Sequence, residues 1–360
     1  MIRRIMIIRH IKKLTLCFIL CFALLPAARA NESSAFDAGK FVMEHVSDAH
    51  EWHLFTVGDV HVSIPLPVIL YSKTGGFHVF LSSRFEHGHA VWQNFRIAQE
   101  GSPHAGKIVE LDASGTELAA LPWDFSITKT VAGLIFSAII IILLFTWLAR
   151  RMQQIAGHAP SGLLNMLEPV ILFVRDDVAK SSIGEHYERF MPFLLSVFFF
   201  ILINNLFGLI PIAPFGANVT GNIGVTLVLA LFTFFVTSFS GNRHYWKEIF
   251  NPDVPVWMKF PLFPLMQLIE IMSMFIKPIV LMVRLFANML AGHMVITVFL
   301  SLIFMFSALL GPVASYGVSV LSVIFSVFIT LLDVLVSFIQ AYVFTLLSAL
   351  YIGMATSGEH

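Results

Sequence analysis

The sequence predicts an all-α polytopic membrane protein with two additions. A small, mostly β domain precedes the membrane segments, and a long, strongly tilted two-helix hairpin closes the chain. Of the 360 residues, 57% are hydrophobic and only 12% are charged, and the mean hydropathy is +0.83. Soluble domains carry about a quarter charged residues, so this composition excludes an ordinary soluble protein. The formal net charge is zero, which gives no indication of a nucleic-acid partner.

Residues 1–30 have the pattern of a secretory signal peptide. Basic residues precede the apolar stretch "LTLCFILCFALL", and Ala28-Arg29-Ala30 supplies a small-residue cleavage site. The apolar stretch is shorter than the roughly 20 residues that a membrane span needs. A lipoprotein anchor on Cys21 is the alternative, but it requires a small residue before the cysteine, where Leu20 stands. Cleavage after Ala30 would leave a chain without cysteine, and hence without disulfides.

Residues 31–123 are predicted to form an exported (periplasmic) domain that is mostly β. The segments "HLFTVGDVHVSI" and "VILYSKTGGFHVFLS" are rich in β-branched and aromatic residues, and Thr74-Gly75-Gly76 favours a hairpin turn. This region holds eight histidines, whose spacing matches no established zinc pattern, so we predict no metal site. Scattered surface histidines are the simpler interpretation, with metal binding by the His87/His89 or His50/His53 pairs as the alternative. The histidines are His45, His50, His53, His61, His78, His87, His89 and His104.

Residues 124–360 are predicted to form the transmembrane domain, with about five membrane segments and a cytoplasmic amphipathic segment. Three spans are expected at about 131–149, 191–214 and 223–239, and the charged stretch 152–190 is the amphipathic segment. Lysines and arginines flank alternate ends of these spans. The positive-inside rule therefore places 150–190 and 241–260 in the cytoplasm. This topology predicts a bacterial inner-membrane protein with a periplasmic N-terminal domain and a cytoplasmic C-terminus.

The last hundred residues predict the hairpin. Between Pro278 and Gly353 the formal charges are Arg284 and Asp333 alone, and the one clear break is "LLGPVASYG", Leu309 to Gly317. Each of the two resulting helices has about 35 residues, which gives about 52 Å of helix. A hydrocarbon core of about 30 Å accommodates such a helix only at a tilt of about 55°, beyond the usual range. Slanted helices of this length would leave a broad apolar face for a partner.

Arg284 is the first candidate functional residue, because a charge at bilayer depth costs at least about 2.5–3.5 kcal/mol. The structural alternative is an arginine that extends to the interface or pairs with a carboxylate. Asn288 follows at i+4 on the same helix face. Glu270, Ser273 and Lys277 precede Arg284 at offsets that keep them close to one face. The sequence therefore predicts a polar seam that leads along the helix to Arg284.

His293 and Asp333 are the second candidate pair. His293 lies nine residues after Arg284, half a turn out of phase, so the two cannot share a helix face. Asp333 and Gln340 lie seven apart on the last helix and do share a face. Imidazole and carboxylate groups both titrate, so a histidine and an acid on adjacent helices predict a proton relay. A histidine that only donates a structural hydrogen bond is the alternative.

The segments "RLFANMLAGH" (284–293), "IQAYVFTLLSALYIGMA" (339–355) and "NLFGLIP" (205–211) carry a family resemblance. From about residue 127 to 355 the chain resembles subunit a of the F-type rotary ATP synthase. That resemblance implies a non-catalytic stator subunit in a proton-driven motor, without a cofactor. The implied partners are the proteolipid ring (subunit c oligomer), the peripheral-stalk subunit b, the rest of the complex and the lipid bilayer.

The resemblance also implies roles for individual residues. Arg284 corresponds to the essential stator arginine, Asn288 to its polar neighbour and Gln340 to the glutamine that faces it. His293 and Asp333 correspond to the pair that passes protons inward, with histidine first and the acid second, as in mitochondrial members. Asp333 is one methylene shorter than the glutamate common there, and the N-terminal domain is an extension of the short bacterial pattern.

Two other classes of function compete with this interpretation. A secondary transporter would use Arg284 to bind an anionic substrate, but such proteins often show internal repeats, which we do not find. A membrane sensor would use residues 31–123 to bind a ligand and would leave the intramembrane charges unexplained. Within the family interpretation the sequence leaves the carrier ion, H⁺ or Na⁺, open.

Overall fold

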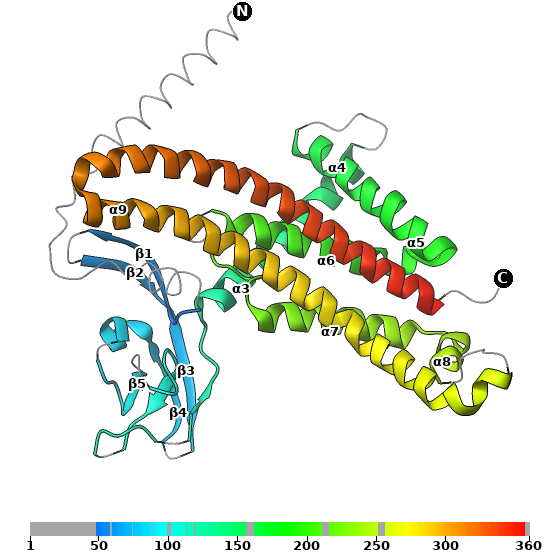
Figure 1. Cartoon of the computed structure of the whole chain (residues 1–360), viewed down its shortest axis with the longest axis horizontal. Coiled ribbons are helices and arrows are strands. Elements are labelled where there is room, and N and C mark those ends of the chain that lie inside the picture. Colours follow the sequence, from blue (N-terminus) through cyan, green and yellow to red (C-terminus); the bar gives the residue numbers. More distant parts are fainter. Residues whose placement is uncertain are drawn as a thin grey trace, which may run out of the picture.

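The computed structural model describes residues 48–57, 60–73, 75–88, 90–98, 102–112, 114–118, 120–155, 162–210, 216–250 and 256–356. A small β region, residues 48–124, precedes a bundle of long helices (Figure 1). The signal-peptide prediction for residues 1–30 lies outside the described residues, as do His45 and His89.

The β region consists of short antiparallel strands, because its sequence alternates apolar and polar residues between turn residues. β1 pairs with β2, β3 lies between β4 and β7, and β5 pairs with β6. Its core is formed by Val68, Leu70, Phe85, Phe95 and Ile108. The strands are β1 (Glu51–Val57), β2 (Val60–Pro65), β3 (Pro67–Ser72), β4 (Gly76–Leu81), β5 (Phe95–Ile97), β6 (Ile108–Glu110) and β7 (Trp123–Asp124), with a 3-10 turn η1 (Ser82–Gly88). The prediction of a mostly β region with a hairpin after Ser72 is confirmed.

The helical part contains a helix at each of the three predicted spans and further helices within the amphipathic segment, although the helix of the second span ends at Gly208, before the predicted end at 214. Thr128 caps the first long helix by accepting a hydrogen bond from the Val131 amide, and Asn222 caps a later one through the Gly224 amide. The elements are α3 (Lys129–Gln154), α4 (Leu163–Phe173), the π-helical η2 (Val174–Lys180), α5 (Ser181–Ile183), η3 (Gly184–His186), α6 (Tyr187–Gly208), α7 (Ile223–Ser240), α8 (Arg243–Phe250) and α9 (Val256–Thr356).

Five helical stretches in the described residues are long and apolar enough to cross a bilayer, which agrees with the predicted polytopic fold. They are Lys129–Gln154, Leu163–Gly208, Ile223–Ser240, Met266–Phe299 and Val318–Thr356. Many of their large apolar side chains are exposed, as expected for helix surfaces that contact lipid or a partner.

Helix α9 doubles back on itself, so that its two halves lie side by side (Figure 1). We call Met266–Phe299 the first arm and Val318–Thr356 the second arm. Phe299 of the first arm stacks on Phe325 of the second, with ring centroids 5.6 Å apart. The chain reverses between the two arms, in the region of the break predicted at Leu309–Gly317. The main chain nevertheless stays helical through this segment. Glycine tolerates a bend, and the proline here costs one amide donor without forcing the chain out of helical φ.

The main core lies between the arms of α9 and helices α3, α4, α6 and α7. Leu281, Leu285 and Met289 of the first arm recur every four residues and form its buried face. Phe198 and Phe344 are among the side chains that meet them from α6 and the second arm. Along the long axis of the molecule, the β region lies at the end where α9 reverses (Figure 1).

Candidate functional site

Arg284 lies on the exposed side of the first arm. The buried face at Leu281, Leu285 and Met289 is turned away from it, and Asn288 lies one turn further along the same exposed side. Apart from Asn288, the neighbouring exposed residues on this arm, including Val280 and Val283, are apolar. Arginine does not lose its proton in proteins, so the first arm presents a permanent positive charge within an apolar stripe.

Gln340 connects the second arm to the position of Arg284. Its side chain is only 3% exposed, and its Nε2 donates a hydrogen bond to the main-chain oxygen of Arg284 over 3.3 Å. The sequence resemblance predicted that this glutamine faces the arginine. Gln340 contacts the arginine's main chain, so it fixes the helix that carries the guanidinium and leaves the charged group itself to face outward.

His293 points from the first arm to the end of α6. A Cβ built on Gly208 would lie 3.1 Å from His293 Nε2, so the imidazole packs directly on this glycine. His293 is therefore on a different side of the arm from Arg284, as its half-turn offset predicted. Its Nε2 is buried and has no hydrogen-bond partner among the described residues.

Asp333 reaches the same place from the second arm. A Cβ built on Gly292 would lie 2.9 Å from Asp333 Oδ2 and 3.0 Å from Oδ1, so the carboxylate rests against the backbone next to His293. Asp333, His293 and Asn288 line one small pocket between the arms and α6. Asp333 Oδ2 is also buried without a partner in the described part of the chain. His293 Nε2 and Asp333 Oδ2 are thus two buried polar atoms without partners in the described residues that belong to the lining of one pocket.

Glu270, Ser273 and Lys277 lie earlier on the first arm and are all partly buried. The Lys277 ammonium lies 5.3 Å from the ring centroid of Tyr351 on the second arm. Lys277 and Tyr351 line a pocket with Tyr245 of α8, and the Thr237 and Ser238 hydroxyls on its wall have no partner among the described residues.

Ionisable side chains near the Glu270 end of the first arm interact electrostatically. Burial raises the pKa of the Tyr245 hydroxyl, and the charge of Glu270 raises it further. The Arg284 guanidinium is within electrostatic range of the Tyr351 hydroxyl. Lys277 of the predicted polar seam thus lines a pocket of mixed polar and apolar side chains between α7, α8 and the two arms.

The residues that make room for the candidate side chains carry no signal of their own as residue types. Gly208 and Gly292 allow His293 and Asp333 to approach the backbone, and both belong to the quoted motif segments. Thr220 was also missed; its hydroxyl donates to Asn205 Oδ1 over 2.6 Å, with both residues buried. Two adjacent asparagines in an otherwise apolar helix were the available signal for this buried polar contact.

Within the described residues, no group of three or more histidine, cysteine, aspartate or glutamate side chains is placed to hold a metal ion. The chemistry that the site can support is proton binding and release at His293 and Asp333, with a fixed charge at Arg284 on another side of the first arm.

The model of the family described as "ATP synthase A chain" matches residues 131–353, which include every candidate residue above. The chain belongs to the ATP synthase A chain family. A second match, over residues 41–125, is to a domain of unknown function, DUF8433. The family assignment confirms the resemblance that the motifs predicted, and the second match falls on the region that the resemblance left unexplained.

Curated relatives in the ATP synthase A chain family support the same assignment. The chain is 45% identical over 239 residues to an ATP synthase subunit a of Chlorobium phaeobacteroides (strain BS1), covering 66% of this chain and 68% of the relative. It is 46% identical over 237 residues to an ATP synthase subunit a 2 of Chlorobium luteolum, covering 66% and 67%. It is 43% identical over 244 residues to the subunit a of Myxococcus xanthus, covering 66% and 75%.

Proposed function

We propose that this chain is the stator subunit of the ATP synthase membrane motor, in which it couples proton flow to rotation of a proteolipid ring. Its partners are then the subunit c ring, the peripheral-stalk subunit b and the rest of the complex. Membership of the ATP synthase A chain family and relatives named ATP synthase subunit a support this function. The subunit itself catalyses no reaction.

The proposed topology has residues 1–30 as a signal peptide, 31–123 in the periplasm and 124–360 in the inner membrane. Arg150 and Arg151 at the end of α3, and Arg243 at the start of α8, then face the cytoplasm. The C-terminus belongs to the same side, because the Asn242 amide donates to the Ala355 oxygen over 2.9 Å and ties the end of α9 to the end of α7.

The two arms of α9 form the proposed docking surface for the ring. They have 34 and 39 residues, so the shorter is about 51 Å long and crosses a core of about 30 Å only at a tilt of about 55°. Large apolar side chains along both arms are exposed, among them Val283, Leu331 and Leu335. A strongly slanted apolar surface of this kind suits contact with a curved ring of helices.

One observation carries the proposed mechanism: Arg284 and His293 lie on different sides of the first arm, and Asp333 of the second arm approaches the side that carries His293. On the ring-facing side, Arg284 lowers the pKa of a passing ring carboxylate and makes it release its proton. His293 and Asp333 pass protons inward from the periplasm, with Asn288 between them and Arg284. Glu270, Ser273 and Lys277 line the route out to the cytoplasm. We propose H⁺ as the carried ion, because both inlet groups bind protons.

Arg284→Ala tests this function in inverted membrane vesicles that contain the assembled complex. ATP-driven acidification, followed with a pH-sensitive dye, should be lost, while ATP hydrolysis and co-purification of subunit c persist. Arg243→Ala is the matched control, since it removes a cation from α8 outside the proposed path, and it should pump normally. Normal pumping by Arg284→Ala would refute the stator role of the arginine.

A further inference from the structure

The β region packs onto the membrane helices through one buried tryptophan. Trp52 of β1 is only 7% exposed and contacts Ala217 and Val219, which lie in the loop between α6 and α7. Ala132 and Leu134 of α3 complete this apolar cluster. The β region therefore has a fixed position against the helices.

The loop under Trp52 is also next to the inlet pair. Ala217 lies close to Gly208, the glycine on which the His293 imidazole packs. On its other side, Ala217 lies so near α3 that a Cβ on Gly133 would be 2.6 Å from the Ala217 Cβ. A short chain of contacts therefore runs from β1 through this loop to His293.

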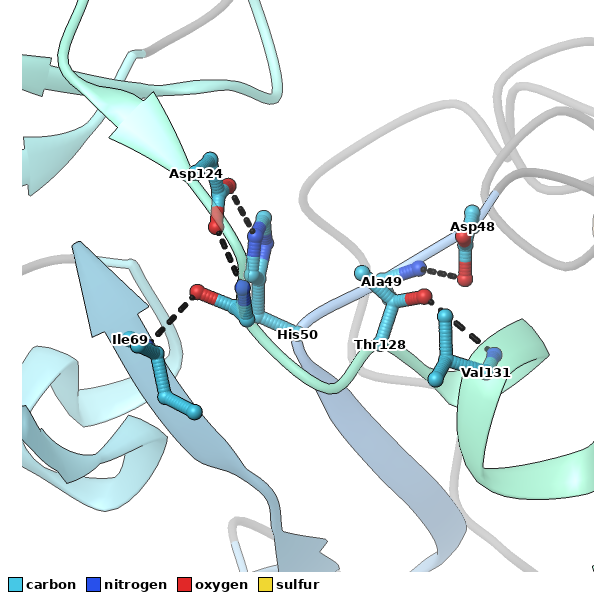
Figure 2. Close-up of polar contacts among 8 residues, drawn as sticks. Asp48, Ala49, His50, Ile69, Asp124, Thr128 and Val131 are labelled. Carbon is cyan, nitrogen blue, oxygen red and sulfur yellow. Dashed lines mark hydrogen bonds and ion pairs between the residues drawn. The ribbon is translucent and has the colours of Figure 1, made fainter. Parts of the chain in front are cut away.

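Hydrogen bonds join the start of the β region to the start of α3. The Lys129 amide donates to the Ala49 oxygen over 2.9 Å, and the Thr130 amide donates to Asp48 Oδ1 over 3.0 Å. The Ala49 amide donates to the same oxygen of Asp48 over 3.1 Å. Figure 2 shows Asp48 and Ala49 beside the capped first turn of α3, with the His50–Asp124 pair on the other side of the chain.

Lys129 places a positive charge where the start of the β region meets the start of α3. Its ammonium is within electrostatic range of the Asp48 carboxylate on one side and of His293 on the other. The charge of Lys129 on α3 thus acts on His293 at longer range, Asp333 of the second arm lines the same pocket as His293, and α6 contributes Gly208, which carries no charge. A cation at this place opposes the arrival of a proton at His293, and a nearby carboxylate offsets that effect.

We propose that the β region forms the outer wall of the proton inlet, and that Asp48 and Lys129 together set the charge through which protons reach His293. This inference rests on the proposed function, and it gives the β region a role in the motor. Asp48 and Lys129 are positioning residues that act on His293 through their charges. The negative charge of Asp48 offsets the positive charge of Lys129, so that protons still reach His293 when the periplasm is only mildly acidic.

Three variants separate charge from structure. Asp48→Asn keeps an oxygen that can accept from the Thr130 amide, as asparagine does at helix starts, and removes only the negative charge. Lys129→Gln removes the positive charge, and the double variant removes both. ATP synthesis is measured in vesicles of the intact complex with the periplasmic-side pH varied, the cytoplasmic-side pH constant and the membrane potential clamped.

Asp48→Asn should shift the pH of half-maximal synthesis to lower periplasmic pH by about half to one unit. Lys129→Gln should shift it in the opposite direction, and the double variant should lie between the two single variants, because the two charges act on His293 with opposite signs. Glu51→Gln is the matched control, because Glu51 lies three residues from Asp48 but accepts a hydrogen bond from Ser63 within the β region. It should leave the profile unchanged.

Profiles of Asp48→Asn and Lys129→Gln that coincide with wild type, or shift in the same direction, would overturn the inference. Because each variant is compared at equal amounts of assembled complex, poor folding lowers the maximal rate without producing opposite shifts. Arg284→Ala in the same vesicles distinguishes the two proposals. If it abolishes synthesis while the profiles stay unchanged, the inlet role of Asp48 and Lys129 fails alone; if it leaves synthesis intact, the stator function fails.

Discussion

Gln340 holds the main chain of Arg284, with its Nε2 donating to the Arg284 oxygen over 3.3 Å. The two residues come from opposite arms of α9, and Gln340 is buried between them. The contact fixes the position of the second arm along the first arm at Arg284, the residue that carries the permanent charge. The guanidinium is left free to face a passing partner group, because the glutamine uses none of its donors.

Gln340→Leu should therefore weaken coupling more than assembly. Loss of one hydrogen bond of ordinary strength allows the arms to shift, and we expect ATP-driven pumping to fall about three- to tenfold. Pumping is measured in inverted vesicles, with subunit c co-purification as the assembly check. Ser337→Ala serves as control, since that hydroxyl donates only to the Asp333 oxygen of its own helix in the contacts described here. Equal losses in both variants would argue against a specific role of Gln340.

Gly292→Ala should block the inlet, because the new Cβ would lie 2.9 Å from Asp333 Oδ2 and displace the carboxylate. Alanine favours helix over glycine by about 1 kcal/mol, so the helix itself would be stabilised and cannot explain a loss. Passive proton flow through vesicles stripped of the soluble sector should fall at least about tenfold.

Gly208→Ala provides the comparison for Gly292→Ala. Its Cβ would meet His293 Nε2 at 3.1 Å, a slightly larger separation from a ring that can turn away. A smaller loss of proton flow is expected than for Gly292→Ala. Unchanged flow in both variants would show that His293 and Asp333 do not line the path.

The membrane architecture was predictable because apolar runs must satisfy their backbone groups within helices. The span predicted at 223–239 is α7, Ile223–Ser240, and the one at 131–149 lies within α3, Lys129–Gln154. The reversal of α9 was expected near Gly311 and Pro312, but not that the chain would stay helical there. Glycine and proline favour a turn in an average context, and packing of the two arms decides the outcome.

The candidate site was predictable as residue types but not as contacts. Helical spacing placed Arg284 and His293 on different faces, because it depends only on residues per turn. The pairing of Gln340 with a main-chain oxygen, and the fit of Asp333 on Gly292, depend on how far one arm slides along the other. Hydrophobic patterning leaves that sliding undetermined. The contact of Trp52 with the α6–α7 loop joins residues more than 150 positions apart and has no local signal.

Trp52→Ala should detach the β region from the helices. Removing a buried tryptophan costs about 3–5 kcal/mol, so amides of β1 and of the loop at 216–222 should exchange faster with solvent in the intact complex. Trp123→Ala is the matched control, because Trp123 is 61% exposed and its removal should cost about 0.5 kcal/mol or less. Similar exchange in the two variants would contradict a fixed joint at Trp52.

The His50–Asp124 pair should make the stability of the β3–β7 junction depend on acid. Burial raises the pKa of the Asp124 carboxyl, but hydrogen bonds from the His50 ring and from Ser126 outweigh burial and hold the pKa below its usual value. The Asp124 side chain is 33% exposed, so we expect a contribution of about 1 kcal/mol or less after solvent screening.

Because the folded-state pKa of Asp124 is lowered, this contribution is fully present above the unfolded-state value of about 3.9 and is lost as the pH falls through the lower folded value. Asp124→Asn should reduce protection of the Phe125 and Ile127 amides, which donate to Ile69 and Pro67 of β3. Hydrogen exchange in the intact complex, corrected for the intrinsic effect of pH, measures this. The variant's protection should be lower near neutral pH and nearly constant below about pH 5, whereas the wild type should converge on it in acid. Parallel curves that stay apart at low pH would mean that the carboxylate charge contributes nothing and that the substitution acts through packing.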